Sequence, residues 1–100
     1  MIEIIRELED FMEEELEGAN EYIDMALKYR LTDKALAEHY CESAKDELKH
    51  GHAHYDWADK MMKANSLAMT AEDNWEFKYK IGEYTKYMNK IAIKIKAYKE

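Results

Sequence analysis

Three side chains in this sequence have the types and spacing of a metal site. Glu47 and His50 form a Glu-x-x-His motif, which places a carboxylate and an imidazole side by side on one face of a helix. Glu15 interrupts a stripe of otherwise apolar residues that recur at alternating spacings of three and four and are expected to face the core: Ile5, Leu8, Met12, Ala19, Tyr22, Ala26 and Tyr29. Because one Glu-x-x-His match is weak evidence on its own, the position of Glu15 relative to the motif decides its interpretation.

The two glutamates are predicted to lie at the same height of a helical hairpin. Glu15 lies sixteen residues before Leu31 and Glu47 lies sixteen residues after it, so a turn near Leu31 brings them level. No lysine or arginine occupies either seam at this level, and buried carboxylates without a partner are costly. A divalent cation is the simplest neutralising group. Mixed carboxylate and imidazole ligation favours iron, with manganese or zinc as alternatives.

These residues have several alternative interpretations. Glu14, at the edge of the seam, and Glu17, on the outward side, compete with Glu15 as the ligand. The Glu-x-x-His motif can also be a simple ion pair at the surface of a bundle. His54 follows His50 by four residues on the same stripe, so it is either an extra ligand, a base that contacts a liganding group, or a hydrogen-bonded core histidine.

Composition and periodicity predict an all-α domain that spans residues 1–100. The sequence is 47% hydrophobic and 37% charged and has three glycines and no proline, which favours long helices over many short strands. The apolar repeats predict helices at about 2–30, 33–65 and 71–99. The first two form a long antiparallel hairpin. Asp33 and Thr70 have the residue types and positions of helix N-caps, and Asp73 stands where a capping box has Glu or Gln.

One hairpin supplies only half of a two-metal site. The main stripe of the third helix contains no acid, and this helix leaves a second apolar surface formed by Trp75, Tyr79 and Ile93. Two hairpins related by a twofold axis would supply one Glu from each of two helices and a Glu-x-x-His from each of the other two. We therefore expect a four-helix bundle completed by dimerisation, in a homodimer or larger homo-oligomer, with two metal ions per dimer.

Residues 8–62 resemble the ferritin-like superfamily, which includes rubrerythrins, ferritins and encapsulated ferritins. In these families a liganding Glu commonly precedes a helix Tyr by seven residues, as Glu15 precedes Tyr22, and a Glu-x-x-His follows about thirty residues later. The resemblance implies a di-iron centre of the ferroxidase or peroxidase type, which encapsulated ferritins assemble between subunits. It also implies that the Tyr22 hydroxyl donates to a liganding carboxylate; the alternative is that Tyr22 simply covers the edge of the core. An encapsulating shell protein is a further implied partner, although residues 94–100 do not resemble a targeting peptide.

The remaining features restrict the class of protein. A net charge of −7, a single cysteine (Cys41) and the lack of a long apolar run predict a cytoplasmic protein with no internal disulfide and no membrane span. Seven lysines between Lys78 and Lys99 keep an anionic partner open, but the net acidity argues against nucleic acid. The alternative function is a non-enzymatic helical oligomerisation or interaction protein with a degenerate metal site.

Overall fold

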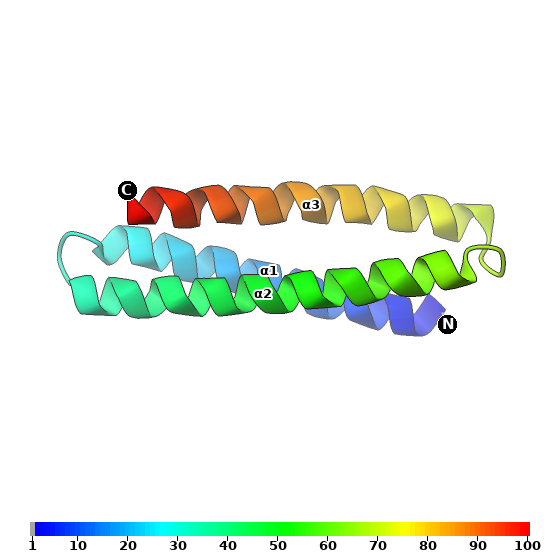
Figure 1. The fold of residues 1–100 in the computed structure, drawn as a ribbon, viewed down its shortest axis with the longest axis horizontal. Coiled ribbons are helices and arrows are strands. Elements are labelled where there is room, and N and C mark those ends of the chain that lie inside the picture. The colour runs from blue at the N-terminus through cyan, green and yellow to red at the C-terminus, as the bar shows by residue number, and fades with distance from the viewer. Residues whose placement is uncertain (1) are drawn as a thin grey trace.

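Three long helices lie side by side and form a rod (Figure 1). The computed structural model describes residues 2–100, and the rod measures 53 × 18 × 14 Å. The helices are α1 (Ile2–Tyr29), α2 (Lys34–Asn65) and α3 (Ala71–Lys99). Their bounds differ from the expected ranges by at most one residue, and residues 2–100 contain no strand. The expectation of an all-helical fold is therefore confirmed.

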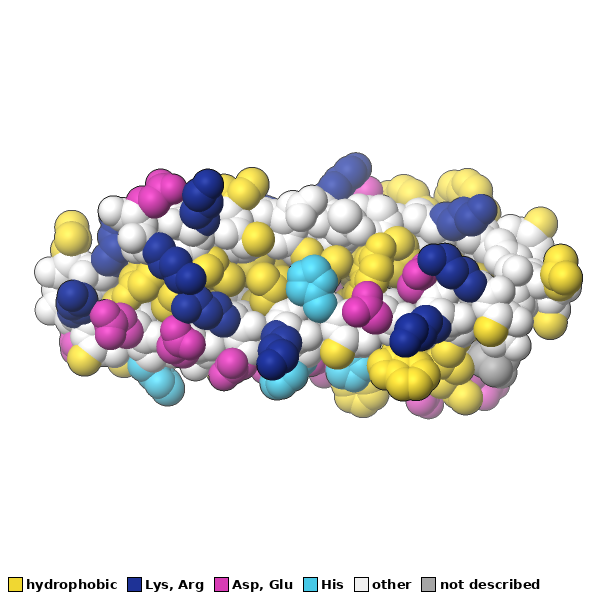
Figure 2. Space-filling view, viewed as in Figure 1, with side chains coloured by type: hydrophobic (Ala, Val, Ile, Leu, Met, Phe, Trp, Pro, Cys, Tyr) yellow, Lys and Arg dark blue, Asp and Glu magenta, His cyan; other side chains and the backbone are white. Residues whose placement is uncertain are grey.

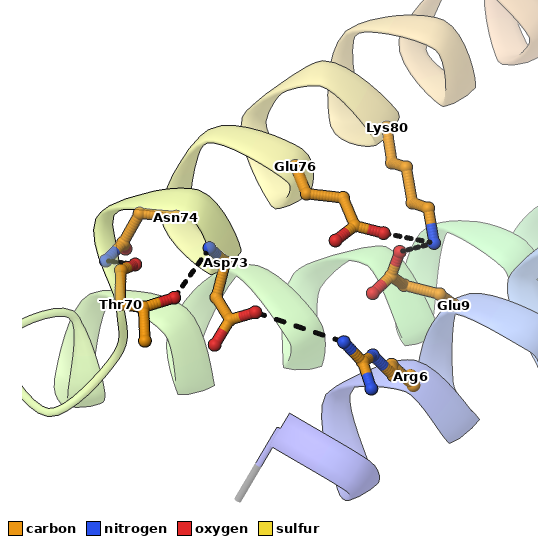
Figure 3. A network of polar contacts seen from close by, with 7 residues as sticks. All are labelled: Arg6, Glu9, Thr70, Asp73, Asn74, Glu76 and Lys80. Atoms are coloured by element: carbon orange, nitrogen blue, oxygen red, sulfur yellow. Dashed lines mark hydrogen bonds and ion pairs between the residues drawn. The ribbon is translucent and has the colours of Figure 1, made fainter.

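Capping side chains start the second and third helices. Asp33 Oδ1 accepts a hydrogen bond from the Leu36 amide at 3.1 Å, and Thr70 Oγ1 accepts one from the Asp73 amide at 3.0 Å. Both N-caps follow the sequence pattern. Instead of completing a capping box, the Asp73 carboxylate faces Arg6 of α1, with 3.9 Å between Oδ1 and Nη2 (Figure 3). Asp is one methylene shorter than the Glu usually found there, so it reaches back less easily.

The α1–α2 hairpin is closely packed because α2 presents small side chains to its neighbours. At Gly51, an added Cβ would lie only 3.0 Å from Cδ2 of Leu16. The other buried residues of α2 that share this stripe are also mostly small: Ala37, Cys41, Ala44 and Ala58. The largest fully buried side chains come mainly from α1: Ile5, Met12, Leu16 and Ile23. Small residues opposite large ones let two helices approach without leaving voids.

The buried stripe of α1 is rotated relative to the expected one. We expected the core to run through Leu8, Glu15 and Tyr22, but the structure buries Glu9, Leu16 and Ile23 more deeply. The Glu15 side chain is 15% exposed and lies at the edge of the hairpin seam. The reason is that α3 packs on one face of the hairpin, so the residues on that face become core residues. Ile5 and Met12 stay in the core as expected, whereas Glu15 and Tyr22 lie toward the other face.

Polar pairs attach α3 to α1. Lys80 Nζ lies 3.3 Å from Oε2 of the buried Glu9, and Lys94 Nζ lies 2.8 Å from Asp24 Oδ1 (Figure 3 shows the first pair). At the C-terminal end of α3, the Arg30 guanidinium donates a hydrogen bond to the Ala97 carbonyl oxygen at 3.2 Å. Every ion pair in residues 2–100 that joins α3 to another helix goes to α1. The seam between α2 and α3 has no such link.

The length and composition of the helices test the expectation that the chain has no membrane span. None of the three helices in the described residues 2–100 combines the length and apolar character needed to cross a bilayer.

Candidate metal centre

The candidate site lies on the face of the hairpin that α3 does not cover. Aromatic contacts across this face join α1 to α2: Phe11 stacks on His54 with 5.6 Å between ring centroids, and Tyr22 stacks on Tyr40 at 6.1 Å. Several apolar side chains here are strongly exposed. We call this surface the open face and define it by Ile4, Phe11, Glu15, Tyr22, Tyr40, Glu47, His50, His54 and Trp57.

The three predicted ligands meet at the middle of the open face. His50 Nδ1 lies 3.6 Å from Glu15 Oε2 and 3.5 Å from Glu47 Oε1. His50 therefore bridges a carboxylate from α1 and a carboxylate from α2. This is the level at which equal distances from the hairpin turn place the two glutamates.

His54 completes the group by contacting Glu15. Its Nδ1 approaches Glu15 Oε1 and also lies 3.1 Å from the backbone carbonyl of His50. Both neighbours are acceptors, and one Nδ1 proton can serve only one of them well. The contact between His54 and Glu15 is compatible with both expectations for His54, and its role toward a metal stays a prediction.

One oxygen of Glu15 is buried without a hydrogen bond. Glu15 Oε1 is shielded from solvent, and its contact with His54 is not aligned as a hydrogen bond. Its neighbour is the His54 imidazole, and the buried Glu9 Oε2 likewise forms no hydrogen bond, although Lys80 lies near it. Two carboxylates and two imidazoles therefore gather at one place on the open face.

Gly18 leaves space for the Glu47 carboxylate against α1. A Cβ added at Gly18 would lie 3.1 Å from Glu47 Oε2, which is tighter than an ordinary contact. Glycine in the middle of a helix costs about 0.5–1 kcal/mol relative to alanine, so an interior glycine usually has a packing reason. Here it allows Glu47 to lean across the seam against α1.

A single copy presents these donors at its surface rather than enclosing them. His50 is 59% exposed at its side chain and Glu47 is 32% exposed. Within residues 2–100, no three His, Cys, Asp or Glu side chains are arranged to hold a metal ion. The donors therefore meet without forming a closed coordination sphere in one chain.

The competing residues lie elsewhere. Glu14 and Glu17 are exposed, and Glu17 lines a hollow of about 150 Å³ that faces α3. That hollow also contains Tyr84, whose pKa burial and the nearby Glu13 raise to about 12, so its hydroxyl keeps its proton. Tyr22 stacks on Tyr40, and within residues 2–100 its hydroxyl forms no hydrogen bond to a carboxylate.

Glu9 was not singled out from the sequence. It is only 5% exposed, and burial raises the pKa of its carboxyl although Lys80 opposes the shift. Its position, four residues after Ile5 and three before Met12, fits the α1 repeat as well as the position of Leu8 does, so helical spacing alone left the choice between them open. It faces α3 and belongs to the packing of the bundle, not to the open face.

Cys41 also belongs to the core. It is 2% exposed, and burial raises the pKa of its thiol, which leaves it a poor nucleophile. Cys41 is therefore a small packing residue of the core.

Comparison with protein-family models, curated proteins and solved structures finds no match to this chain.

Proposed function

We propose that this chain is a metal-binding protein of ferritin-like type, in which two hairpins form a di-iron site that oxidises Fe(II) with oxygen. The observation that carries the proposal is the meeting of Glu15, Glu47 and His50 on the open face, where a Glu15 oxygen is buried without a hydrogen bond. A cation shared with a second copy would neutralise the two carboxylates and close the group.

The apolar surroundings of the site support pairing of two copies through the open face. Ile4 is 48% exposed, Phe11 53%, and Trp57 60%. Large apolar side chains grouped around a polar centre are typical of an interface. A twofold axis through the centre would bury them and bring two copies of each ligand together.

Each side chain has a role in this arrangement. Glu15 is proposed as a terminal ligand, Glu47 as the bridging ligand, and His50 as the nitrogen ligand that completes each coordination sphere. His54 would hold the Glu15 carboxylate in place, and Gly18 would leave room for Glu47. Bound iron would supply the redox chemistry that transfers electrons from Fe(II) to oxygen, while manganese or zinc would suit the same donors.

Metal analysis of matched variants tests the proposal. Protein loaded anaerobically with Fe(II) and passed through a desalting column is expected to retain about one iron per chain. Glu15→Ala and His50→Ala are expected to lose it. His52→Ala, a histidine change on the same helix but away from the open face, is expected to retain it. Exposure to oxygen should then convert the iron to Fe(III) faster than in free solution. Retention of iron in both ligand variants would contradict the assignment of these ligands.

A second function remains a candidate because the site's side chains also contact one another. His50 contacts both glutamates and His54 contacts Glu15, so two protonated imidazoles could neutralise two carboxylates without a metal. A structural oligomerisation protein would then assemble equally well in the presence of a chelator. Assembly that needs the metal would favour the di-iron function.

A further inference from the structure

Two hollows lie along the seam between α2 and α3, on a different side of α2 from the open face. The larger has a volume of about 410 Å³ and lies between Leu48 of α2 and Ile95 of α3. The smaller, of about 220 Å³, lies near the α2–α3 loop between Met62 and Phe77. Figure 2 shows an apolar strip that runs between these helices, with Lys and Arg side chains along it.

The floor of this seam is formed by the edge of the core. Met62 is 4% exposed, Phe77 6% and Ile95 8%, so each turns only a small part of its surface outward. Ala92 is exposed on the rim of the larger hollow. No ion pair within residues 2–100 joins α2 to α3, which leaves the apolar edge accessible along the seam.

The walls of the seam are basic. The side chains lining the two hollows include a single acid, Asp59, and five lysines: Lys45, Lys49, Lys63, Lys78 and Lys99. Lys45 pairs with Glu42 and Lys63 with Asp59, both at 2.8 Å. Lys49, Lys78 and Lys99 form no ion pair with the described residues. Like charges on both sides of an apolar groove favour an anionic occupant.

We propose that the α2–α3 seam is a docking groove for an amphipathic helix with acidic flanks, supplied by a partner protein. The apolar stripe of that helix would lie over Leu48, Ile95 and Phe77. Its carboxylates would meet the unpaired lysines on each side. This mode of recognition buries an apolar face in a groove and uses flanking charges to select the partner.

The dimensions of the groove favour a helix over a small amphiphile. Lys45 and Lys63 mark its two ends on α2 and are 18 residues apart, which corresponds to about 27 Å along a helix. A partner helix of about five turns would reach both hollows. A single-chain carboxylic acid would fill only one of them. A helix in the groove would also be a fourth helix against the three of this chain, which is a common bundle arrangement.

Two synthetic peptides distinguish charge-selected docking from general stickiness. Both are about 20 residues long and carry the same leucine stripe, but one has glutamates beside the stripe and the other has lysines. Fluorescence anisotropy of the labelled peptides with the full chain is expected to show binding of the glutamate peptide. Its affinity should fall as salt is raised, and the lysine peptide should bind at least about tenfold more weakly.

Matched variants locate the binding site. The double change Lys49→Glu with Lys99→Glu is expected to reverse the preference between the peptides. Lys90→Glu with Lys96→Glu makes the same change in net charge on exposed positions that do not line the hollows, so it should leave the preference unchanged. Circular dichroism checks that each variant keeps its helical content.

Three results would overturn this proposal. They are equal binding of both peptides, a preference that survives the Lys49→Glu with Lys99→Glu change, and binding of dodecanoate without binding of the glutamate peptide. The last result would identify a site for small amphiphiles. None of these measurements depends on metal, so they are independent of the proposed di-iron site.

Discussion

Three glycines interrupt long helices in this protein, and each has a different environment. Gly82 is exposed, and an added Cβ would meet nothing within 4 Å. An added Cβ would crowd the Leu16 side chain at Gly51 and the Glu47 carboxylate at Gly18. Because alanine is the better helix former, the effect of adding a methyl group at each position depends on its neighbours.

Gly82→Ala should raise the free energy of unfolding by about 0.5–1 kcal/mol, because it improves helix propensity without a clash. Gly51→Ala should lower it by about 1 kcal/mol, because the new Cβ would overpack the Leu16 contact. Urea denaturation followed by circular dichroism measures both. A stabilising effect at Gly51 would show that the hairpin is less tightly packed than described.

Gly18→Ala separates the site from the stability of the helix. The new methyl group would displace the Glu47 carboxylate, so metal affinity is expected to fall by about tenfold. Helix stability is not expected to fall in parallel, because Glu47 is a flexible side chain that can move. Competition with a metal-sensitive dye measures the affinity, with Gly82→Ala as the control. Equal metal affinity in the Gly18→Ala and Gly82→Ala variants would show that Gly18 does not position the Glu47 carboxylate.

Glu9 should make stability depend on pH in a defined direction. Burial raises the pKa of its carboxyl above the ordinary 4.5, so ionisation costs more in the folded state than in the unfolded state. The contribution of Glu9 is therefore most favourable below pH 4.5 and is lost as the pH rises through the folded-state pKa.

Glu9→Gln should consequently be more stable than the wild type at pH 7, and the difference should shrink as the pH falls through the raised folded-state pKa and be lost by about pH 4.5. Gln keeps an acceptor for Lys80, which also contacts Glu76 at 3.5 Å. Glu76→Gln, at a more exposed position, serves as the control and should have little effect. Denaturation curves at pH 7 and pH 4 test this. A variant less stable than the wild type at pH 7 would mean that the ion pair with Lys80 outweighs burial.

At the scale of single elements, the helices could be predicted from the sequence but the rotation of α1 could not. Apolar spacing and the caps at Asp33 and Thr70 placed the helix ends within one residue. Ile5 and Met12 lie on both the expected and the observed stripe, so periodicity leaves the choice between Glu15 and Leu16 open. That choice depends on which side of α1 is covered by α3, a tertiary contact that local spacing does not encode.

The turn between α1 and α2 determines the height at which the two glutamates meet, and Asp33 fixes the start of α2. Asp33→Ala should cost about 1 kcal/mol, since the Leu36 amide loses its capping acceptor. Thr32→Ala, at an exposed neighbouring position with no capping contact, should cost less than half of that. Thermal unfolding followed by circular dichroism compares the two. Equal costs would mean that the side chain of Asp33 does not cap the helix.

At the scale of the whole molecule, the two sides of the hairpin have different surroundings. α3 covers one side, where polar pairs attach it to α1. The open face carries the candidate ligands among exposed aromatic side chains. The level of Glu15 and Glu47 could be predicted because it follows from chain length on each side of the turn. The exposure of the His50 side chain in the assembled protein could not be predicted, because it depends on whether a second molecule covers the open face.

The central claim is that two copies of this chain share a metal site that neither forms alone. Native mass spectrometry of the iron-loaded protein tests it directly, because one spectrum counts both chains and metal ions. A metal site shared by two copies predicts a dimer of about 24 kDa, twice the 11.9 kDa of one chain, or a larger even assembly, with one iron per chain. Glu15→Ala should give a species without iron. A monomer that binds iron, or a wild-type dimer that holds none after loading, would contradict the account.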